Sequence, residues 1–98
     1  MLYLIVDGMM SGTGIRDAVE GGYVDPVDLG VSANLADRIL RWLRDYENAR
    51  YFQYQDENRV AALDAQGISI GRALQKELPD AKIEYYSNAE LRRIPLGD

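Results

Sequence analysis

The 98-residue chain contains no cysteine and no histidine. Without cysteine, it can form no disulfide, no thiolate nucleophile and no cysteine-based metal site. Without histidine, no side chain has an unperturbed pKa near neutral pH. An acid–base catalyst would then have to be a carboxylate, a lysine or a tyrosine with a strongly shifted pKa. These two absences predict a protein that is not an enzyme.

Long apolar runs are missing as well. The N-terminal run MLYLIV has six apolar residues and no basic residue before it, which is too short for the core of a signal peptide. No run approaches the roughly 18 residues of a transmembrane helix. We therefore expect one domain, residues 1–98, that lies in the cytoplasm and makes no contact with a membrane.

Positive charge is scarce in the first third of the chain. The net charge is −5, and residues 1–32 hold five acidic residues against Arg16 alone. An acidic surface disfavours nucleic acid as a partner and favours a cationic protein, whose encounter it would steer. The same acidity also keeps a small domain soluble. The five acidic residues are Asp7, Asp17, Glu20, Asp25 and Asp28.

Two amphipathic helices are predicted from apolar spacing. Ser32 is the predicted N-cap of a first helix over about 33–48. Asp64 is the predicted N-cap of a second helix over about 65–78, which ends before Pro79. Asn58 could cap a short helical piece before the second helix. The apolar stripe of the first helix consists of Leu35, Ile39, Trp42, Leu43 and Tyr46.

Two strands are predicted with these helices. Residues 2–6 are apolar and end at a turn dipeptide, and residues 81–87 alternate with Ile83 and Tyr85 pointing inward. A third strand remains open at 92–96, and residues 51–54 fit either a short strand or the frayed end of a helix. Together these elements predict an α+β fold in which a small sheet packs with two main helices.

Glycines mark two further features. Residues 8–30 hold six of the nine glycines and are expected to form a long irregular connection, in which Asp25 caps a single turn closed by Gly30. Gly67 and Gly71 share a face of the second helix with Leu74. Because glycine costs a helix interior roughly 1 kcal/mol, we expect the helix backbone to approach the sheet closely there.

The glycines that follow the first strand invite comparison with phosphate-binding loops. A P-loop needs a lysine, and none occurs before Lys76, while Gly12-x-Gly14 lacks the third glycine of the dinucleotide fingerprint. The aspartates do not match the ligand spacing of a calcium loop. We therefore expect no cofactor and no metal. A small nucleotide-binding regulator that uses the Gly12–Gly14 loop remains an alternative, as does a homo-oligomerising or adaptor module that pairs through an exposed strand edge.

Tyrosines are the common aromatic residue, with seven of nine aromatic side chains. Trp42, Tyr46, Tyr3 and Tyr85 are expected in the core. The remaining candidates are expected on the surface, where tyrosine is enriched in the energetic centres of protein interfaces. The alternative is a half-buried ring with a hydrated hydroxyl. The expected surface tyrosines are Tyr23, Tyr51, Tyr54 and Tyr86.

The order of these elements resembles that of small bacterial immunity proteins of contact-dependent growth inhibition and polymorphic toxin systems. An opening strand leads into a Gly/Asp-rich loop, then a helix with Trp, then a helix that ends Glu-Leu before an Ile-Glu-Tyr strand. Gly71 departs from the Ala- or Leu-rich run usual in that second helix. The matching positions are Asp28-Leu29-Gly30-Val31-Ser32, Leu35, Trp42, Asp64-Ala65-Gln66-Gly67, Glu77-Leu78 and Ile83-Glu84-Tyr85.

The resemblance implies a protein that neutralises the C-terminal domain of a cognate toxin, as a monomer that forms a 1:1 heterodimer. With the acidic charge, it implies a basic toxin, a nuclease, whose active site is covered. An acidic, tyrosine-bearing surface built from the 8–30 loop and the 50–57 segment would make the contact. The candidate contact residues are Asp17, Glu20, Tyr23, Asp25, Asp28, Tyr51, Tyr54, Asp56 and Glu57.

Overall fold

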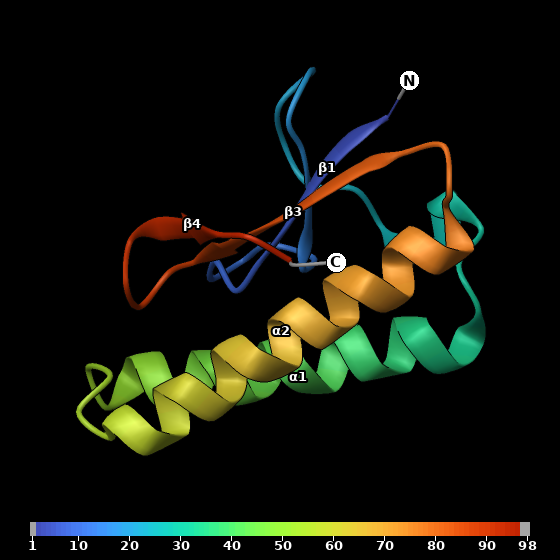
Figure 1. Cartoon of the computed structure of the whole chain (residues 1–98). Helices are drawn as coiled ribbons and strands as arrows, with labels where there is room; N and C mark the ends of the chain where they lie inside the picture. The colour runs from blue at the N-terminus through green and yellow to red at the C-terminus, as the bar shows by residue number, and fades with distance from the viewer. Residues whose placement is uncertain (1, 97–98) are drawn as a thin grey trace.

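A computed structural model describes residues 2–96, so Met1, Gly97 and Asp98 of the predicted domain lie outside the described residues. Two helices pack against one side of a four-stranded sheet (Figure 1), which confirms the predicted α+β class. The elements in chain order are β1 (Tyr3–Asp7), β2 (Ile15–Asp17), the short 3₁₀ helix η1 (Pro26–Leu29), α1 (Ala33–Tyr51), α2 (Glu57–Glu77), β3 (Lys82–Ser87) and β4 (Arg92–Ile94).

The sheet has the strand order β2-β1-β3-β4. β1 and β3 are parallel and central, and each pairs antiparallel with a short edge strand. A parallel pair requires a long crossover connection, which the α1–α2 hairpin supplies. β4 confirms the third strand that the sequence left open.

The predicted irregular connection over 8–30 contains a strand that the sequence analysis did not foresee. β2 has only three residues, too few for an alternating pattern to stand out, and it forms because β1 offers it a pairing edge. The expected turn is confirmed. Asp25 accepts a hydrogen bond from the Val27 N–H at 3.0 Å, and Gly30 closes the turn with φ of 77°.

Helix α1 begins where the sequence predicted. The Ser32 hydroxyl accepts a hydrogen bond from the Leu35 N–H at 3.2 Å, and every residue of the predicted apolar stripe is buried. The helix continues to Tyr51, three residues beyond the predicted end. This settles the question over 51–54, because that segment is the end of a helix and a turn, not a strand.

The predicted break at Asp64 is wrong. α2 is one continuous helix whose N-cap is Asp56, which accepts a hydrogen bond from the Arg59 N–H at 3.1 Å, so neither Asn58 nor Asp64 caps a helix. Asp64 is buried in the middle of α2. Its carboxylate accepts hydrogen bonds from the hydroxyls of Tyr46, Tyr85 and Ser87 at 3.0, 2.6 and 2.8 Å. A residue type typical of helix ends serves here as a buried acceptor.

The core lies between the sheet and the two helices. Trp42 stands at its centre, with its ring edge-on to those of Tyr46 and Tyr85 and its indole N–H donated to the Leu63 carbonyl at 2.8 Å. Tyr3, which we expected in the core, is half-buried on the opposite face of the sheet. The alternation of β1 explains this, because Leu4 and Val6 point toward the helices and Tyr3 points away.

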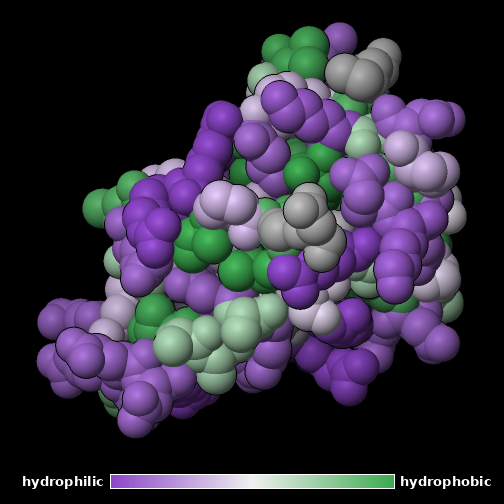
Figure 2. Space-filling view, in the orientation of Figure 1, coloured by the Kyte–Doolittle hydropathy of each residue, from purple (hydrophilic) through white to green (hydrophobic). Residues whose placement is uncertain are grey.

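The C-terminal segment closes the core beside α2. Leu96 lies over Gly71, and the Arg72 guanidinium donates a hydrogen bond to the Leu96 carbonyl at 2.7 Å. Apolar side chains accordingly show through between α2 and the C-terminal strands in the middle of the face seen in Figure 2, framed by hydrophilic residues. The predicted close approach to the sheet is confirmed at Gly67, which lies against the Tyr85 ring of β3; Gly71 instead approaches Leu96, which follows β4.

The two glycines of α2 give a matched test of this packing. A Gly67→Ala methyl group would overlap the Tyr85 ring, which cannot move because its hydroxyl is bound to Asp64. We expect the free energy of unfolding to fall by about 1–2 kcal/mol, since overpacking outweighs the gain in helix propensity. Gly71→Ala would meet only the end of the flexible Leu96 side chain, at 2.8 Å, and should stay within about 1 kcal/mol of wild type. Urea denaturation measures the free energy of unfolding of both variants. Equal losses in the two would contradict the conclusion that Gly67 is packed more tightly than Gly71.

Candidate functional site

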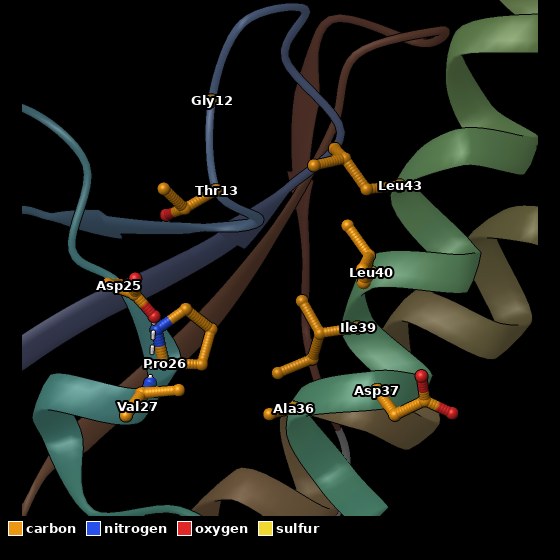
Figure 3. A pocket seen from close by; sticks show the side chains of 10 residues that line it. All are labelled: Gly12, Thr13, Asp25, Pro26, Val27, Ala36, Asp37, Ile39, Leu40 and Leu43. Carbon is orange, nitrogen blue, oxygen red and sulfur yellow. Dashed lines mark hydrogen bonds between the residues drawn. The ribbon is translucent and has the colours of Figure 1, made fainter. Parts of the chain in front are cut away.

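An open groove separates residues 8–30, here called the N-terminal arm, from the outer surface of α1 (Figure 3). We call it the arm–helix groove; its volume is about 420 Å³. Ile39 and Leu40 reach from α1 toward the arm, and Pro26 and Val27 face them from η1. The lining residues are Gly12, Thr13, Asp25, Pro26, Val27, Ala36, Asp37, Ile39, Leu40 and Leu43.

The walls of the groove are apolar and remain accessible. Val27 on the arm is 70% exposed, and Leu40 on the helix is 45% exposed. Ile39 and Leu43 are buried and belong to the core, so they form the inner part of the lining. Large apolar side chains left exposed on facing walls are typical of surfaces that bind other molecules.

Hydrogen bonds hold the arm in place along the groove. The Thr13 hydroxyl donates to the Val24 carbonyl at 2.6 Å, and Asp25 fixes the start of η1 through the Val27 N–H. Gly12 packs against the Tyr23 ring, where a Cβ would come within 2.7 Å of a ring carbon. The groove is therefore formed by the fold itself and does not need a ligand to shape it.

The charged groups of the groove are acidic. Asp25 and Asp37 are the charged side chains of the lining. Asp37 turns its carboxylate away from the gap in Figure 3 and pairs with Arg41 at 3.3 Å. Among residues 2–96, no ion pair involves Asp25 or the exposed Asp28 on η1. Negative charge is therefore left unbalanced on the arm side of the groove.

The structure divides the nine predicted contact residues into two groups. Five lie on the N-terminal arm, and four lie at the turn between α1 and α2 (residues 51–57, here called the hairpin end). Figure 1 places η1 and the hairpin end near opposite ends of α1, while the loop that follows β1 lies nearer the hairpin end. The two groups of predicted contacts therefore lie apart on the surface. The arm group is Asp17, Glu20, Tyr23, Asp25 and Asp28; the hairpin group is Tyr51, Tyr54, Asp56 and Glu57.

Several of these residues also have structural tasks. The Asp17 carboxylate accepts hydrogen bonds from the backbone N–H groups of Glu20 and Val19, which lower its pKa. Tyr23 is half-buried and donates its hydroxyl to Asp7 at 2.9 Å. Burial and this hydrogen bond raise the pKa of Tyr23. The exposed Asp25 and Glu20 leave more of their side chains free for a partner.

The hairpin end presents an aromatic pair. Tyr51 is 82% exposed and Phe52 is 58% exposed, with the rings edge-to-face at 5.1 Å. Gln53 and Tyr54 follow in the left-handed region, at φ of 58° and 56°, which non-glycine residues adopt at a cost. Phe52 is not among the predicted contacts, although its position beside Tyr51 in an aromatic run is a usable signal.

A polar cluster covers the sheet face that points away from the helices. Asp7 at the end of β1 is only 1% exposed, and Arg16 lies 3.5 Å from its carboxylate and over the Tyr86 ring. Burial raises the pKa of Asp7, although its contacts with Tyr23, the Met9 N–H and Arg16 oppose the shift. The charges of this face are therefore largely paired with each other.

The described residues offer little for catalysis. Burial raises the pKa of Tyr46 to about 12, away from neutral pH. Within residues 2–96, no three acidic side chains come together as metal ligands, and no helix is both long and apolar enough to cross a membrane. Residues 67–71 have the Gly-x-Ser-x-Gly spacing of a nucleophile elbow, but Ser69 lies inside α2 and not at a strand–helix turn. The Gly12–Gly14 loop leads into β2, so no helix begins there to bind phosphate.

One family matches most of the chain. The family described as Serratia CdiI immunity protein-like matches residues 3–88. That span runs from β1 through β3 and includes both the arm–helix groove and the hairpin end. No curated protein and no solved structure matches the chain.

The buried Asp7 carboxylate makes stability depend on pH. Because burial raises its pKa in the folded protein, its contribution to stability is fully present below the unfolded value of about 3.9 and is lost as pH rises through the folded value. Asp7→Asn removes this titration. We expect the stability of the variant relative to wild type to increase between about pH 4 and pH 7, measured by urea denaturation at each pH. A relative stability that falls over this range would contradict the argument; the exposed Asp28→Asn serves as the control.

Proposed function

Because the chain belongs to the Serratia CdiI immunity protein-like family, we propose that it binds the C-terminal toxin domain of a cognate secreted toxin and blocks its activity. The observation that carries this proposal is the extent of the family match, which covers residues 3–88 and therefore nearly every helix and strand. The chain would act in the cytoplasm as a stoichiometric inhibitor and not as an enzyme.

The proposed mechanism is occlusion of the toxin's active site. An inhibitor of this kind needs a preformed surface, and the hydrogen-bonded arm and the fixed helix hairpin supply one. The net charge of −5 favours a basic toxin, and a nuclease has such a surface because it must bind phosphates. Neither nucleic acid nor a membrane is part of the proposal.

Both groups of predicted contact residues are retained as proposed contacts. The acidic residues of the arm would steer the encounter, and the exposed rings of the hairpin end would lengthen the lifetime of the complex. One carboxylate oxygen of Asp56 already caps α2, so only the other oxygen would accept a hydrogen bond from a partner.

Co-expression tests the function directly. Cells that express the C-terminal domain of the cognate secreted toxin are expected to stop growing, and co-expression of this chain should restore growth. The purified proteins should elute together as a 1:1 complex. A toxin domain from an unrelated system is the control and should not be neutralised. Failure to restore growth, with both proteins folded and expressed, would contradict the proposed function.

Salt tests the electrostatic part. If acidic residues steer the encounter, the association rate should fall by about tenfold or more as the Debye length shrinks from about 30 Å at 0.01 M salt to about 3 Å at 1 M. The dissociation rate should change much less, because the contacts that set it are short-range. Stopped-flow fluorescence of a label on the toxin measures both rates. An association rate that does not change with salt concentration would contradict electrostatic steering.

A further inference from the structure

We propose that the arm–helix groove is the surface of this protein that binds the toxin, and that the groove binds a toxin segment in which a lysine or arginine lies beside an apolar side chain. The inference rests on the proposed function, because it takes the toxin as the partner. It goes further in choosing one surface and in stating the chemistry that fits there.

The shape of the groove favours an apolar side chain. Val27 and Leu40 lie on opposite sides of the gap (Figure 3) and are 70% and 45% exposed. A partner side chain that enters between them would remove both from water at once. Buried apolar anchors of this kind, seated in a pocket near the centre of an interface, carry much of the affinity of protein complexes.

The groove is already formed before a partner arrives. The Thr13–Val24 and Asp25–Val27 hydrogen bonds fix the arm, and Ile39, which is 1% exposed, anchors the helix wall in the core. A partner would therefore order few groups when it binds. Preorganisation lowers the entropic cost of association and increases affinity for the same contact area.

The charge beside the apolar walls selects a cation. Asp25 and Asp37 are the charged residues of the lining, and Asp28 follows on η1. Asp37 is already paired with Arg41 and points away from the gap, so the negative charge open to a partner is that of Asp25 and Asp28. A lysine or arginine would meet these two carboxylates, whereas an acidic side chain would be repelled.

Two other exposed regions lack this combination. At the hairpin end, Asp56 and Glu57 stand close in sequence to Arg50 and Arg59, so its charge is mixed. On the open sheet face, Arg93 pairs with Glu84.

A smaller hollow at the end of α2 shares part of it. Its volume is about 220 Å³, and its apolar walls hold Glu77 and Asp80. Both carboxylate oxygens of Glu77 already accept hydrogen bonds from Ser32. The arm–helix groove is the larger of these two hollows and keeps Asp25 without an ion pair among the described residues.

Opposite charges at one position test the occupant. Leu40→Arg and Leu40→Glu remove the same apolar contact, but they add charges of opposite sign. We expect Leu40→Arg to raise the Kd for the C-terminal domain of the cognate toxin by at least about tenfold, and Leu40→Glu to raise it less. Leu91 is 74% exposed on the turn between β3 and β4, so Leu91→Arg and Leu91→Glu are matched controls that should stay within about twofold of wild type.

Calorimetry measures the Kd values, and thermal melts confirm that each variant is folded. If wild type itself does not bind the toxin, the proposed function fails. If wild type binds and both Leu40 variants keep its Kd, the groove proposal is overturned while the function stands. If Leu40→Glu binds more weakly than Leu40→Arg, the cationic occupant is overturned.

Thiol labelling gives a second readout that does not depend on energetics. The chain has no cysteine, so Leu40→Cys, Phe52→Cys and Leu91→Cys each introduce a unique thiol. Bound toxin should slow maleimide labelling of the Leu40→Cys thiol and leave that of Leu91→Cys unchanged. Protection of Phe52→Cys without protection of Leu40→Cys would place the contact at the hairpin end and overturn the proposal. Slower labelling of Leu40→Cys at high protein concentration without toxin would identify a second copy of the chain as the occupant of the groove. That result would also overturn the proposal.

Discussion

The buried carboxylate of Asp64 joins the elements on which the rest of the structure depends. It lies on α2 and accepts hydrogen bonds from Tyr46 on α1 and from Tyr85 and Ser87 on β3. A buried acceptor of this kind is costly unless its partners are all present, so the two helices and the central strand are held in one mutual arrangement. Tyr46 extends the network, since its oxygen also accepts the Ala89 N–H at 3.0 Å. The helix hairpin can therefore sit on the sheet in one way.

This arrangement decides which surfaces remain available. The helices cover one face of the sheet, and long polar and aromatic side chains such as Arg16 and Tyr86 cover the other. The arm, which is fixed to β1 through β2, is left beside the outer surface of α1. A groove forms there because the arm and the helix are each anchored to the core separately and no side chain of the described residues fills the space between them.

Local signals in the sequence were sufficient for much of the fold. Ser32 and Asp25 were identified as caps because capping depends on residues two or three positions away. Gly67 was identified as a close contact because glycine destabilises a helix interior, so its presence there indicates that the backbone packs closely against a neighbour. Asp64, β2 and Tyr3 were misjudged because their environments are set by residues far along the chain. For the site, the acidic and tyrosine residues were found by type. Leu40 and Phe52 were not found. The aromatic run around Phe52 was a usable signal, whereas the exposure of Leu40 depends on whether a segment far along the chain covers it.

The parallel pairing of β1 with β3 has a consequence for how the protein is made. Tyr3 pairs with Lys82, so β1 leaves the ribosome well before its central partner β3 exists. The helix hairpin can form earlier, from contacts that are nearer in sequence. The N-terminal strand would meanwhile expose its apolar residues, and at roughly 5–20 residues per second this interval lasts several seconds. A newly synthesised molecule thus gains its complete sheet, and the surfaces that depend on it, only after β3 has left the ribosome.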